Sequence, residues 1–278
     1  MGKLNDIGIV YAATGPKFVE ECRRSIQSLI SIHSQIAISV FTDDSTAFSD
    51  LRNRHSLKDH LLRSPKKSFE DKICALTESP YEKTLFLDCD TLVFSNPAKI
   101  FDLLENFDLA VCMETYKPHY SHTVPEVFPE FNTGVMALRT GSIQVKNFLV
   151  NWLELYREQR KSRRDIKHDQ PAFREALYYS QLRISPLPSD WNFFICHPAI
   201  LNAGENIKIL HTRIPKHEFS QNLKIKTQHS RVFLPNSNAM HPSRIGSSNR
   251  FLNTFLSLST IPFRIWSGVK KFFILNQQ

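Results

Sequence analysis

The residues best suited to chemistry in this sequence are two acids, Asp88 and Asp90, at the end of a short apolar run. Residues 84–87 are apolar or β-favouring, which predicts a buried strand that ends at the acids. Because side chains at positions i and i+2 of an extended segment point the same way, we expect both carboxylates to share one cation, while Cys89 points into packing. Oxygen ligands suit Mg²⁺ or Mn²⁺. The alternative is that the acids only cap the turn towards Asn96.

His211 is a candidate third ligand of the same cation. It follows a second apolar run, residues 207–210, which also predicts a strand. Open α/β sheets bind ligands at the carboxyl ends of their strands, so two strands of one sheet could bring His211 to the acids. An imidazole together with carboxylates is an acceptable ligand set for Mn²⁺. Taken alone, a histidine after a strand is more often a surface residue.

Strands and helices are expected to alternate around these residues. The expected strands are residues 7–13, 36–41, 84–87, 108–113, 131–138, 182–187 and 207–210. The expected helices are residues 16–30, 69–77, 97–104, 143–160 and 169–178, with Thr14 and Asp169 as caps of the first and the last. Residues 52–67 form a polar, basic segment to which no helix or strand is assigned. This alternation predicts an α/β fold with a mostly parallel sheet and helices on both faces.

Of 278 residues, 41% are hydrophobic and 22% charged, which predicts one large folded domain, residues 1–217, with an appendage.

The charge of the chain is concentrated near its C-terminus. The formal net charge is +8, yet from Arg213 onward ten Lys or Arg accompany a single acid, Glu218. The preceding part is nearly neutral. This asymmetry favours an appended surface-binding segment over a nucleic-acid enzyme.

The C-terminal segment is expected to comprise a basic linker, residues 218–250, and an amphipathic helix, residues 251–278. Bulky apolar residues share one face of this helix: Ile265, Trp266, Val269, Phe272 and Phe273. Pro262 and the basic residues interrupt any apolar run long enough to span a membrane. The helix therefore either lies on a membrane surface or packs on the body.

The cysteines favour a reducing compartment. There are five, an odd number, and their spacing shows no metal-binding pairs. The N-terminal residues lack the apolar region of a secretory signal. We therefore expect a cytoplasmic protein, either free or peripheral on the inner face of a membrane.

Several motifs together resemble the glycogenin-like glycosyltransferases, which have the GT-A fold, a Rossmann-like arrangement. The motifs occur in the same order and with similar spacing: Leu85-Phe86-Leu87-Asp88-Cys89-Asp90-Thr91, then Phe131-Asn132-Thr133-Gly134, then Asp169-Gln170, then Leu210-His211. The resemblance covers roughly residues 5–217. It implies an enzyme, a hexosyltransferase that moves a sugar from a nucleotide-sugar, with UDP as the expected nucleotide.

The resemblance also implies roles for the acids and the histidine. Asp88, Asp90 and His211 would hold Mn²⁺ or Mg²⁺, which bridges the donor diphosphate and stabilises the leaving group. The segment that contains Cys89 would bind the donor. Transfer with retention is expected from the resemblance alone. The acceptor is a carbohydrate, a lipid-linked sugar or a protein; no nucleic acid is expected as a partner.

Further donor contacts follow from the resemblance at three basic or hydroxyl positions. Thr14 follows the first strand, where the family has its nucleotide-binding loop, although a helix cap would also explain it. Lys72 stands where the family often places a basic residue facing the donor, although a solvated lysine is an equal alternative. The family's phosphate-binding lysine has no direct counterpart, because its position is His217. Lys216, one place earlier, is the candidate in its stead.

Three further residues match the family's sugar pocket. Asn132 and the pair Asp169-Gln170 would line it, with Asp169 or Gln170 near the anomeric carbon as a catalytic residue but not as a nucleophile. Asp169 as a helix cap is the alternative.

Other classes of protein share single features with this sequence. Haloacid-dehalogenase-like phosphatases also use two acids after a strand, but normally on the first strand and with Gly after the second acid. Nucleotidyltransferases usually show a Gly-rich phosphate loop after the first strand, which is missing here. A non-catalytic nucleotide-sugar-binding protein remains a further alternative.

Overall fold

The computed structural model describes residues 5–52, 56–62, 64–114, 123–163, 167–195, 199–201, 205–212, 231–234 and 239–242. The chain divides into two compact units. The first comprises Met1–Phe194 and Ile207–Arg213, and the second comprises Ile195–Asn206 and Ile214–Gln278. Lys216 and the expected helix 251–278 lie outside the described residues. The domain boundaries at residues 217 and 250 stay predictions.

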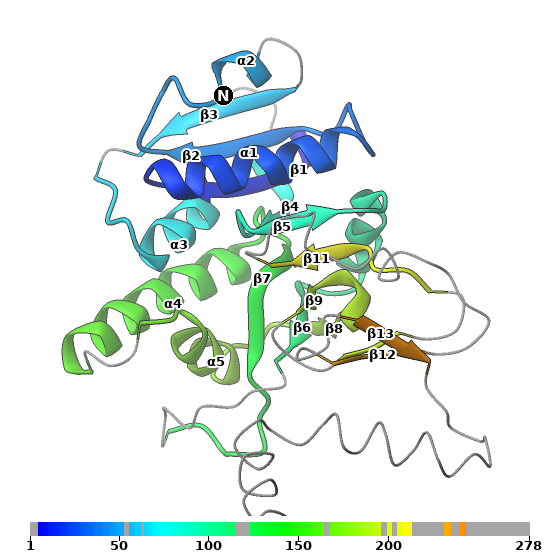
Figure 1. Ribbon diagram of the computed structural model, residues 1–278. Helices are drawn as coiled ribbons and strands as arrows, with labels where there is room; N and C mark the ends of the chain where they lie inside the picture. Colours follow the sequence, from blue (N-terminus) through cyan, green and yellow to red (C-terminus); the bar gives the residue numbers. More distant parts are fainter. Residues whose placement is uncertain are drawn as a thin grey trace, which may run out of the picture. The chain divides into compact units, whose positions relative to one another are not determined.

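A seven-stranded sheet forms the centre of the first unit (Figure 1). Its strands, in spatial order, are β3 (Leu57–Leu61), β2 (Ile38–Thr42), β1 (Asn5–Ala13), β4 (Tyr81–Leu87), β7 (Phe131–Leu138), β6 (Leu109–Met113) and β8 (Ile184–Pro186). Neighbouring strands are parallel except on the two sides of β7, which runs antiparallel to both β4 and β6. The predicted mostly parallel α/β sheet is therefore confirmed.

Strand β3 was not expected from the sequence. Its residues, Leu-Lys-Asp-His-Leu, lie within the polar, basic segment 52–67, to which the sequence pattern assigns no strand. The strand pairs with β2 along its whole length, from Ile38 opposite Leu57 to Thr42 opposite Leu61. Charged side chains are common on edge strands because they discourage pairing with other chains. The polar composition of this segment therefore does not indicate a strand, although the backbone forms one.

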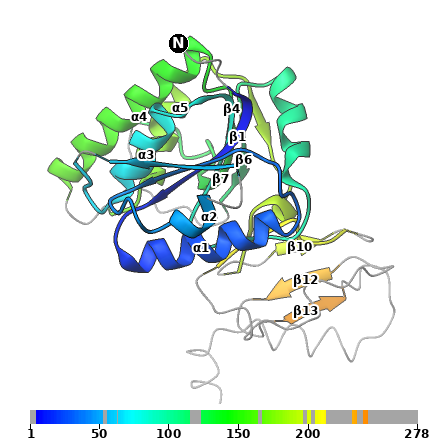
Figure 2. The ribbon, with the colours of Figure 1, turned by 90° about the horizontal axis from the view of Figure 1, so that it is seen from above.

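Helices cover both faces of the sheet (Figure 2). Helix α1 (Pro16–Ile30) and the 3₁₀ helix η1 (Pro97–Glu105) pack on one face, together with the short helix α2 (Ser49–Arg52). Helices α3 (Phe69–Thr77), α4 (Ile143–Ser162) and α5 (Gln170–Tyr178) pack on the other face. On that face, the fully buried rings of Trp152 and Phe173 meet edge to face with centroids 4.9 Å apart. This contact joins α4 to α5, which Asp169 directly precedes, and α3, which carries Lys72, packs against α4.

The prediction that Thr14 caps helix α1 is wrong. The cap position is Gly15, which has no side chain and makes no side-chain cap bond. Its φ of 89° and ψ of 152° define a conformation that essentially only glycine adopts. The hydroxyl of Thr14 instead donates to the Asp71 carboxylate at 2.9 Å. Thr14 is therefore tied to helix α3 rather than to α1.

A second, three-stranded sheet carries His211. It consists of β5 (Thr91–Val93), β11 (Ile209–His211) and β9 (Phe193–Phe194). Strand β11 runs antiparallel to β5, with His211 opposite Thr91. The expectation that His211 reaches the acids from a strand of the main sheet is therefore wrong: antiparallel pairing with the strand after Asp90 brings it there.

The second unit contains a three-stranded antiparallel sheet of β10 (Ala199–Leu201), β12 (Arg231–Leu234) and β13 (Ala239–Pro242). Strands β12 and β13 fall within residues 218–250, for which the sequence suggested only a linker. Within the part of the chain that the structure describes, no helix has the length and apolar character needed to cross a membrane.

Candidate active site

The two acids lie in a turn, not on an extended strand. Strand β4 ends at Leu87, and both the amide and the hydroxyl of Thr91 donate to the Asp88 carbonyl, at 3.2 and 2.8 Å. The expected alternation of strand side chains therefore does not apply. The carboxylates converge because the chain turns back between them. Cys89 points away, as expected, and its thiol donates to the Ala12 carbonyl at 3.1 Å.

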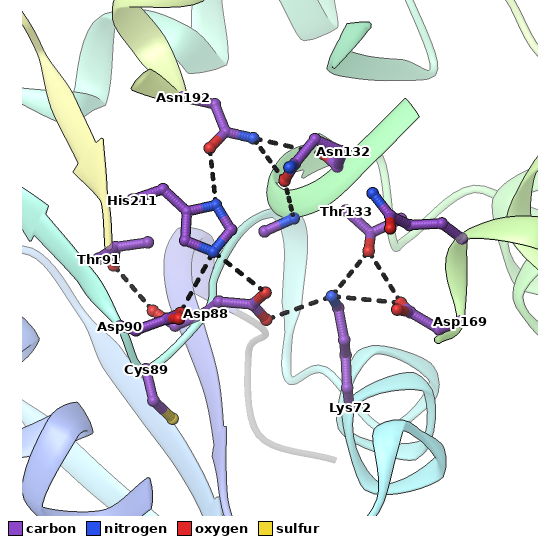
Figure 3. Close-up of polar contacts among 12 residues, drawn as sticks. Lys72, Asp88, Cys89, Asp90, Thr91, Asn132, Thr133, Asp169, Asn192 and His211 are labelled. Carbon is purple, nitrogen blue, oxygen red and sulfur yellow. Dashed lines mark hydrogen bonds and ion pairs between the residues drawn. The ribbon is translucent and has the colours of Figure 1, made fainter. Parts of the chain in front are cut away.

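His211 completes a cluster with both acids (Figure 3). Its Nε2 lies 3.2 Å from Asp90 Oδ1 and 3.8 Å from Asp88 Oδ2. One ligand atom from each of the three residues falls within 4.8 Å of the others. Burial would lower the pKa of His211, but the hydrogen bond and charge of Asp90, and the charge of Asp88, raise it above its ordinary value. Two carboxylate oxygens and an imidazole nitrogen at these separations fit a divalent cation such as Mn²⁺.

A chain of hydrogen bonds determines which ring nitrogen of His211 carries the proton when the ring is neutral. Asn132 donates its amide to Glu114 at 2.9 Å, and its oxygen accepts from the Gly134 amide at 3.0 Å. That oxygen also accepts from the Asn192 amide at 2.9 Å. The Asn192 oxygen is then left to accept from Nδ1 of His211, at 3.0 Å. A carboxylate only accepts and a backbone amide only donates, so every bond in the chain has one allowed direction.

Neutral His211 therefore carries its proton on Nδ1 and presents the lone pair of Nε2 to the acids. Histidine ligands of metals are commonly oriented in this way by a partner on the other ring nitrogen. Sequence reasoning missed Asn192, because an Asn in a Pro-Ser-Asp-Trp-Asn segment reads as an ordinary turn residue.

Replacing Asn192 by Leu should weaken Mn²⁺ binding by about 10- to 100-fold, because His211 loses the partner that fixes its tautomer. Titration followed by the electron paramagnetic resonance of free Mn²⁺ would measure the affinity. Nitrogen NMR of the metal-free protein should show neutral His211 as a mixture of tautomers. Asn151→Leu, at an exposed position on α4, is the matched control. Unchanged affinity in the Asn192→Leu protein would refute the orienting role.

Lys72 links the acidic turn to Asp169. Its Nζ lies 2.9 Å from the Thr133 hydroxyl and 3.2 Å from carboxylate oxygens of both Asp88 and Asp169 (Figure 3). The Thr133 hydroxyl in turn donates to Asp169 at 2.9 Å. Only 5% of the Lys72 side chain and 2% of the Asp169 side chain are exposed. The reading of Lys72 as a solvated surface lysine is therefore wrong.

The charges in this network depend on one another. Burial would lower the pKa of Lys72, but the carboxylates of Asp169 and Asp88 raise it above its ordinary value, so the ammonium form persists. Burial raises the pKa of Asp88, with Asp90 and Asp169 acting in the same direction and Lys72 and His211 opposing them. A further cation beside Asp88 would favour its ionised form. The cluster thus brings three carboxylates, of Asp88, Asp90 and Asp169, next to two basic groups, Lys72 and His211.

Asp169 and Gln170 begin helix α5. Asp169 occupies the cap position, as predicted, but its side chain makes no cap hydrogen bond and is committed to Thr133 and Lys72. The reading of Asp169 as a helix cap by its side chain is therefore wrong. Gln170 donates its side-chain amide to the Phe131 carbonyl at 3.0 Å. Both residues are thus held against strand β7.

A cavity of about 350 Å³ lies beside this network. Its lining includes five of the residues expected to bind a donor: Thr14, Lys72, Asp88, Cys89 and Asp90. Asn132 does not line it, and its amide is engaged by Glu114, Gly134 and Asn192. Lys216 lies outside the described residues. Three aromatic residues also line the cavity: Phe18, Phe69 and Phe86.

Comparisons with known proteins give one family and one fold. The model of the family described as "Glycosyl transferase family 8" matches residues 5–213. No curated protein sequence matches significantly. Among solved structures, the galactosyltransferase LgtC, crystallised with donor and acceptor sugar analogues, matches with a TM-score of 0.54 at 14% identity, over 78% of this chain and 90% of LgtC.

Two other solved structures match to a similar degree. GlyE of Streptococcus pneumoniae has a TM-score of 0.54 at 15% identity, over 94% of this chain and 62% of GlyE. Mouse xyloside xylosyltransferase 1 has a TM-score of 0.53 at 15% identity, over 76% of this chain and 100% of the mouse chain. At these identities the likeness concerns the fold.

Proposed function

The chain belongs to glycosyl transferase family 8, and from that membership we propose that it transfers a hexose from a nucleotide-sugar bound in the cavity described above. It is a glycosyltransferase that depends on a nucleotide-sugar, and its fold is of the GT-A type. The observation that carries the assignment to this cavity is that Asp88 and Asp90, which line it, form one cluster with His211.

Family members with this fold generally depend on a divalent metal ion. We propose that Asp88, Asp90 and His211 hold it, and that it is Mn²⁺, because the set combines an imidazole with carboxylates. When bound, the ion would neutralise negative charge on the departing nucleoside diphosphate. Asn192 supports this role by keeping the Nε2 lone pair of His211 directed at the acids.

The remaining residues would position the donor sugar. Lys72 forms ion pairs with both Asp88 and Asp169 and so fixes the positions of the two carboxylates. The Asp169 carboxylate is already bound by Thr133 and Lys72. This supports a role in stabilising charge rather than in attacking the sugar. Gln170, beside it and half-buried, would face the reacting carbon of the sugar. The network therefore favours positioning and charge stabilisation over covalent catalysis.

The finer assignments follow from the resemblance to the glycogenin-like enzymes. We propose UDP as the nucleotide, retention of anomeric configuration, and a carbohydrate, lipid-linked or protein acceptor. Proton NMR of the anomeric signal in the first product would test retention. An inverted product would exclude it.

A thermal-shift screen with UDP-, GDP-, ADP- and CDP-hexoses tests the proposal directly. At least one donor should raise the melting temperature with Mn²⁺ and not with EDTA. Ligand at about 100 times its Kd stabilises the folded state by about 2.7 kcal/mol, which is several degrees. Free hexose should give no shift. The proposal fails if none of the nucleotide-sugars shifts the transition, or if EDTA leaves the shift unchanged.

Family membership decides between the classes of enzyme considered from the sequence. It favours sugar transfer over a phosphatase of the haloacid-dehalogenase type and over nucleotidyl transfer. The acidic turn also follows the fourth strand of the chain, β4, and not the first, where the phosphatases place it.

A further inference from the structure

Lys67 adopts a backbone conformation that is unusual for a residue with a side chain. Among the described residues, it is the only non-glycine residue with a positive φ, 51°. This left-handed conformation is unfavourable for residues with a Cβ atom, and glycine adopts it readily. Such a conformation persists only where surrounding contacts enforce it, and it occurs often at functional sites. A lysine at this position therefore costs backbone energy that a glycine would not, which indicates that its side chain has a function.

Asp71 enforces the conformation. Its buried carboxylate accepts the backbone amides of Lys66 and Lys67, each at 2.7 Å, and the hydroxyl of Thr14 at 2.9 Å. Three donors thus satisfy one carboxylate that sits on helix α3. The turn after β1 and the loop before α3 are joined through it, and both contribute residues to the lining of the cavity.

Asp43 joins the same two segments from the end of strand β2. One of its oxygens accepts the Gly15 amide at 2.9 Å, and the other lies 3.5 Å from the Lys67 ammonium. The Lys67 side chain is 63% exposed. Exposed ion pairs contribute little to stability, so this contact does not explain why a lysine occupies a left-handed position.

The position of the side chain suggests a ligand instead. Lys67 lines the same cavity as Asp88 and Asp90. Lys72, which also lines it, is committed to Asp88, Asp169 and Thr133. The loose contact of Lys67 with Asp43 leaves its ammonium able to reorient towards an anion that enters the cavity.

We propose that Lys67 binds a phosphate of the donor's nucleoside diphosphate, and that Asp71 is the positioning residue that holds it there. An ammonium on a flexible stem suits phosphate, because it presents a compact charge with three rotatable donors. The assignment rests on the proposed function, since it requires a nucleoside diphosphate in this cavity. It adds a cation that the family resemblance did not indicate.

The test compares Lys67→Gly with the wild type. Glycine accepts the backbone conformation and removes the whole side chain, including the ammonium group. Calorimetry with Mn²⁺ would give the affinities for UDP, GDP, ADP and CDP and for the matching nucleosides. Affinity for the preferred diphosphate should fall at least about tenfold, because a hydrogen bond to a charged group is lost. Nucleoside affinity should stay constant, and the melting temperature should stay the same or rise.

The neighbouring lysine provides the matched control. Lys66 lies in the same loop but does not line the cavity, so Lys66→Ala should bind every ligand like the wild type. Wild-type affinity of the Lys67→Gly protein for the diphosphate, or an equal loss for nucleoside and diphosphate, would overturn the proposal. A wild-type protein that binds none of the four diphosphates would instead contradict the proposed function itself, and this proposal with it.

A double-mutant cycle tests Asp71. In Asp71→Asn, the amide can accept from the loop but cannot replace both carboxylate oxygens, so diphosphate affinity should fall about threefold or more. If Asp71 acts through Lys67, the same substitution should have little further effect on diphosphate affinity in the Lys67→Gly protein. Additive losses would show that Asp71 acts only on the structure of the loop, and would remove its positioning role.

Discussion

Asn in place of Asp90 is expected to reduce the metal-dependent transferase activity by about three orders of magnitude. The substitution keeps the shape of the side chain but removes an anionic ligand from the group that Asp88 and His211 complete. Stabilisation of transition-state charge by a metal contributes several kcal/mol, and about 4 kcal/mol corresponds to a thousandfold. Initial rates of donor hydrolysis or transfer at saturating Mn²⁺ would measure the loss.

Stability should respond differently from activity in the Asp90→Asn protein. Without metal, the new amide can donate to Nε2 of His211, and one of the clustered carboxylates is gone. The melting temperature in EDTA should therefore change little, while the stabilisation by added Mn²⁺ should largely disappear. Asp102→Asn, at an exposed position on η1, is the control and should behave as the wild type. Full activity of Asp90→Asn would contradict the metal site.

The end of strand β4 at the two acids was predictable because its signal is local, although the turn that holds the acids was not. An apolar strand of β-favouring residues stops at Asp88 and Asp90, and the structure ends β4 at Leu87. The path of His211 was not predictable in the same way. Its strand pairs with β5 in a separate sheet, and the choice of partner strand depends on contacts between residues far apart in sequence. The three residues do converge, but the expected route that joins them was wrong.

The supporting residues were harder to find for a physical reason. Asn192, Thr133 and Asp71 act through side-chain hydrogen bonds to partners at least 19 residues away, except for the bonds that Asp71 accepts from its own loop. Polar residues of these types are common in turns and at helix starts, so no local pattern distinguishes them. The left-handed conformation of Lys67 is similarly absent from sequence patterns, because glycine is the residue expected there.

The glycine of the motif Phe131-Asn132-Thr133-Gly134 has a structural role. A glycine inside a strand often marks a place where a ligand or another backbone approaches closely. The structure places the ring of His211 there instead: a Cβ atom at position 134 would lie 2.2 Å from its Cε1, 2.6 Å from its Nδ1 and 3.0 Å from its Nε2. Gly134 therefore makes room for the candidate metal ligand.

Replacing Gly134 by Ala should consequently displace His211 from the acids. Neither side of the contact yields easily. Strand β7 lies between β4 and β6, and the buried ring is held by Asn192 and Asp90. We expect Mn²⁺ affinity and activity to fall at least about 100-fold, the upper range for losing a residue that orients a ligand. Overpacking should also lower the free energy of unfolding by about 1–3 kcal/mol.

A second substitution separates this contact from a general effect on the sheet. In the His211→Ala protein the ring is absent, so adding Ala at position 134 should cost almost no further stability, and the two substitutions should be strongly non-additive. Thermal unfolding of the four proteins in EDTA gives the coupling. Equal destabilisation in both backgrounds would mean that the methyl group disturbs β7 itself. Wild-type Mn²⁺ affinity of the Gly134→Ala protein would contradict this prediction. It would mean that the His211 ring can move away from position 134 and that metal binding does not require the orientation fixed by Asn192.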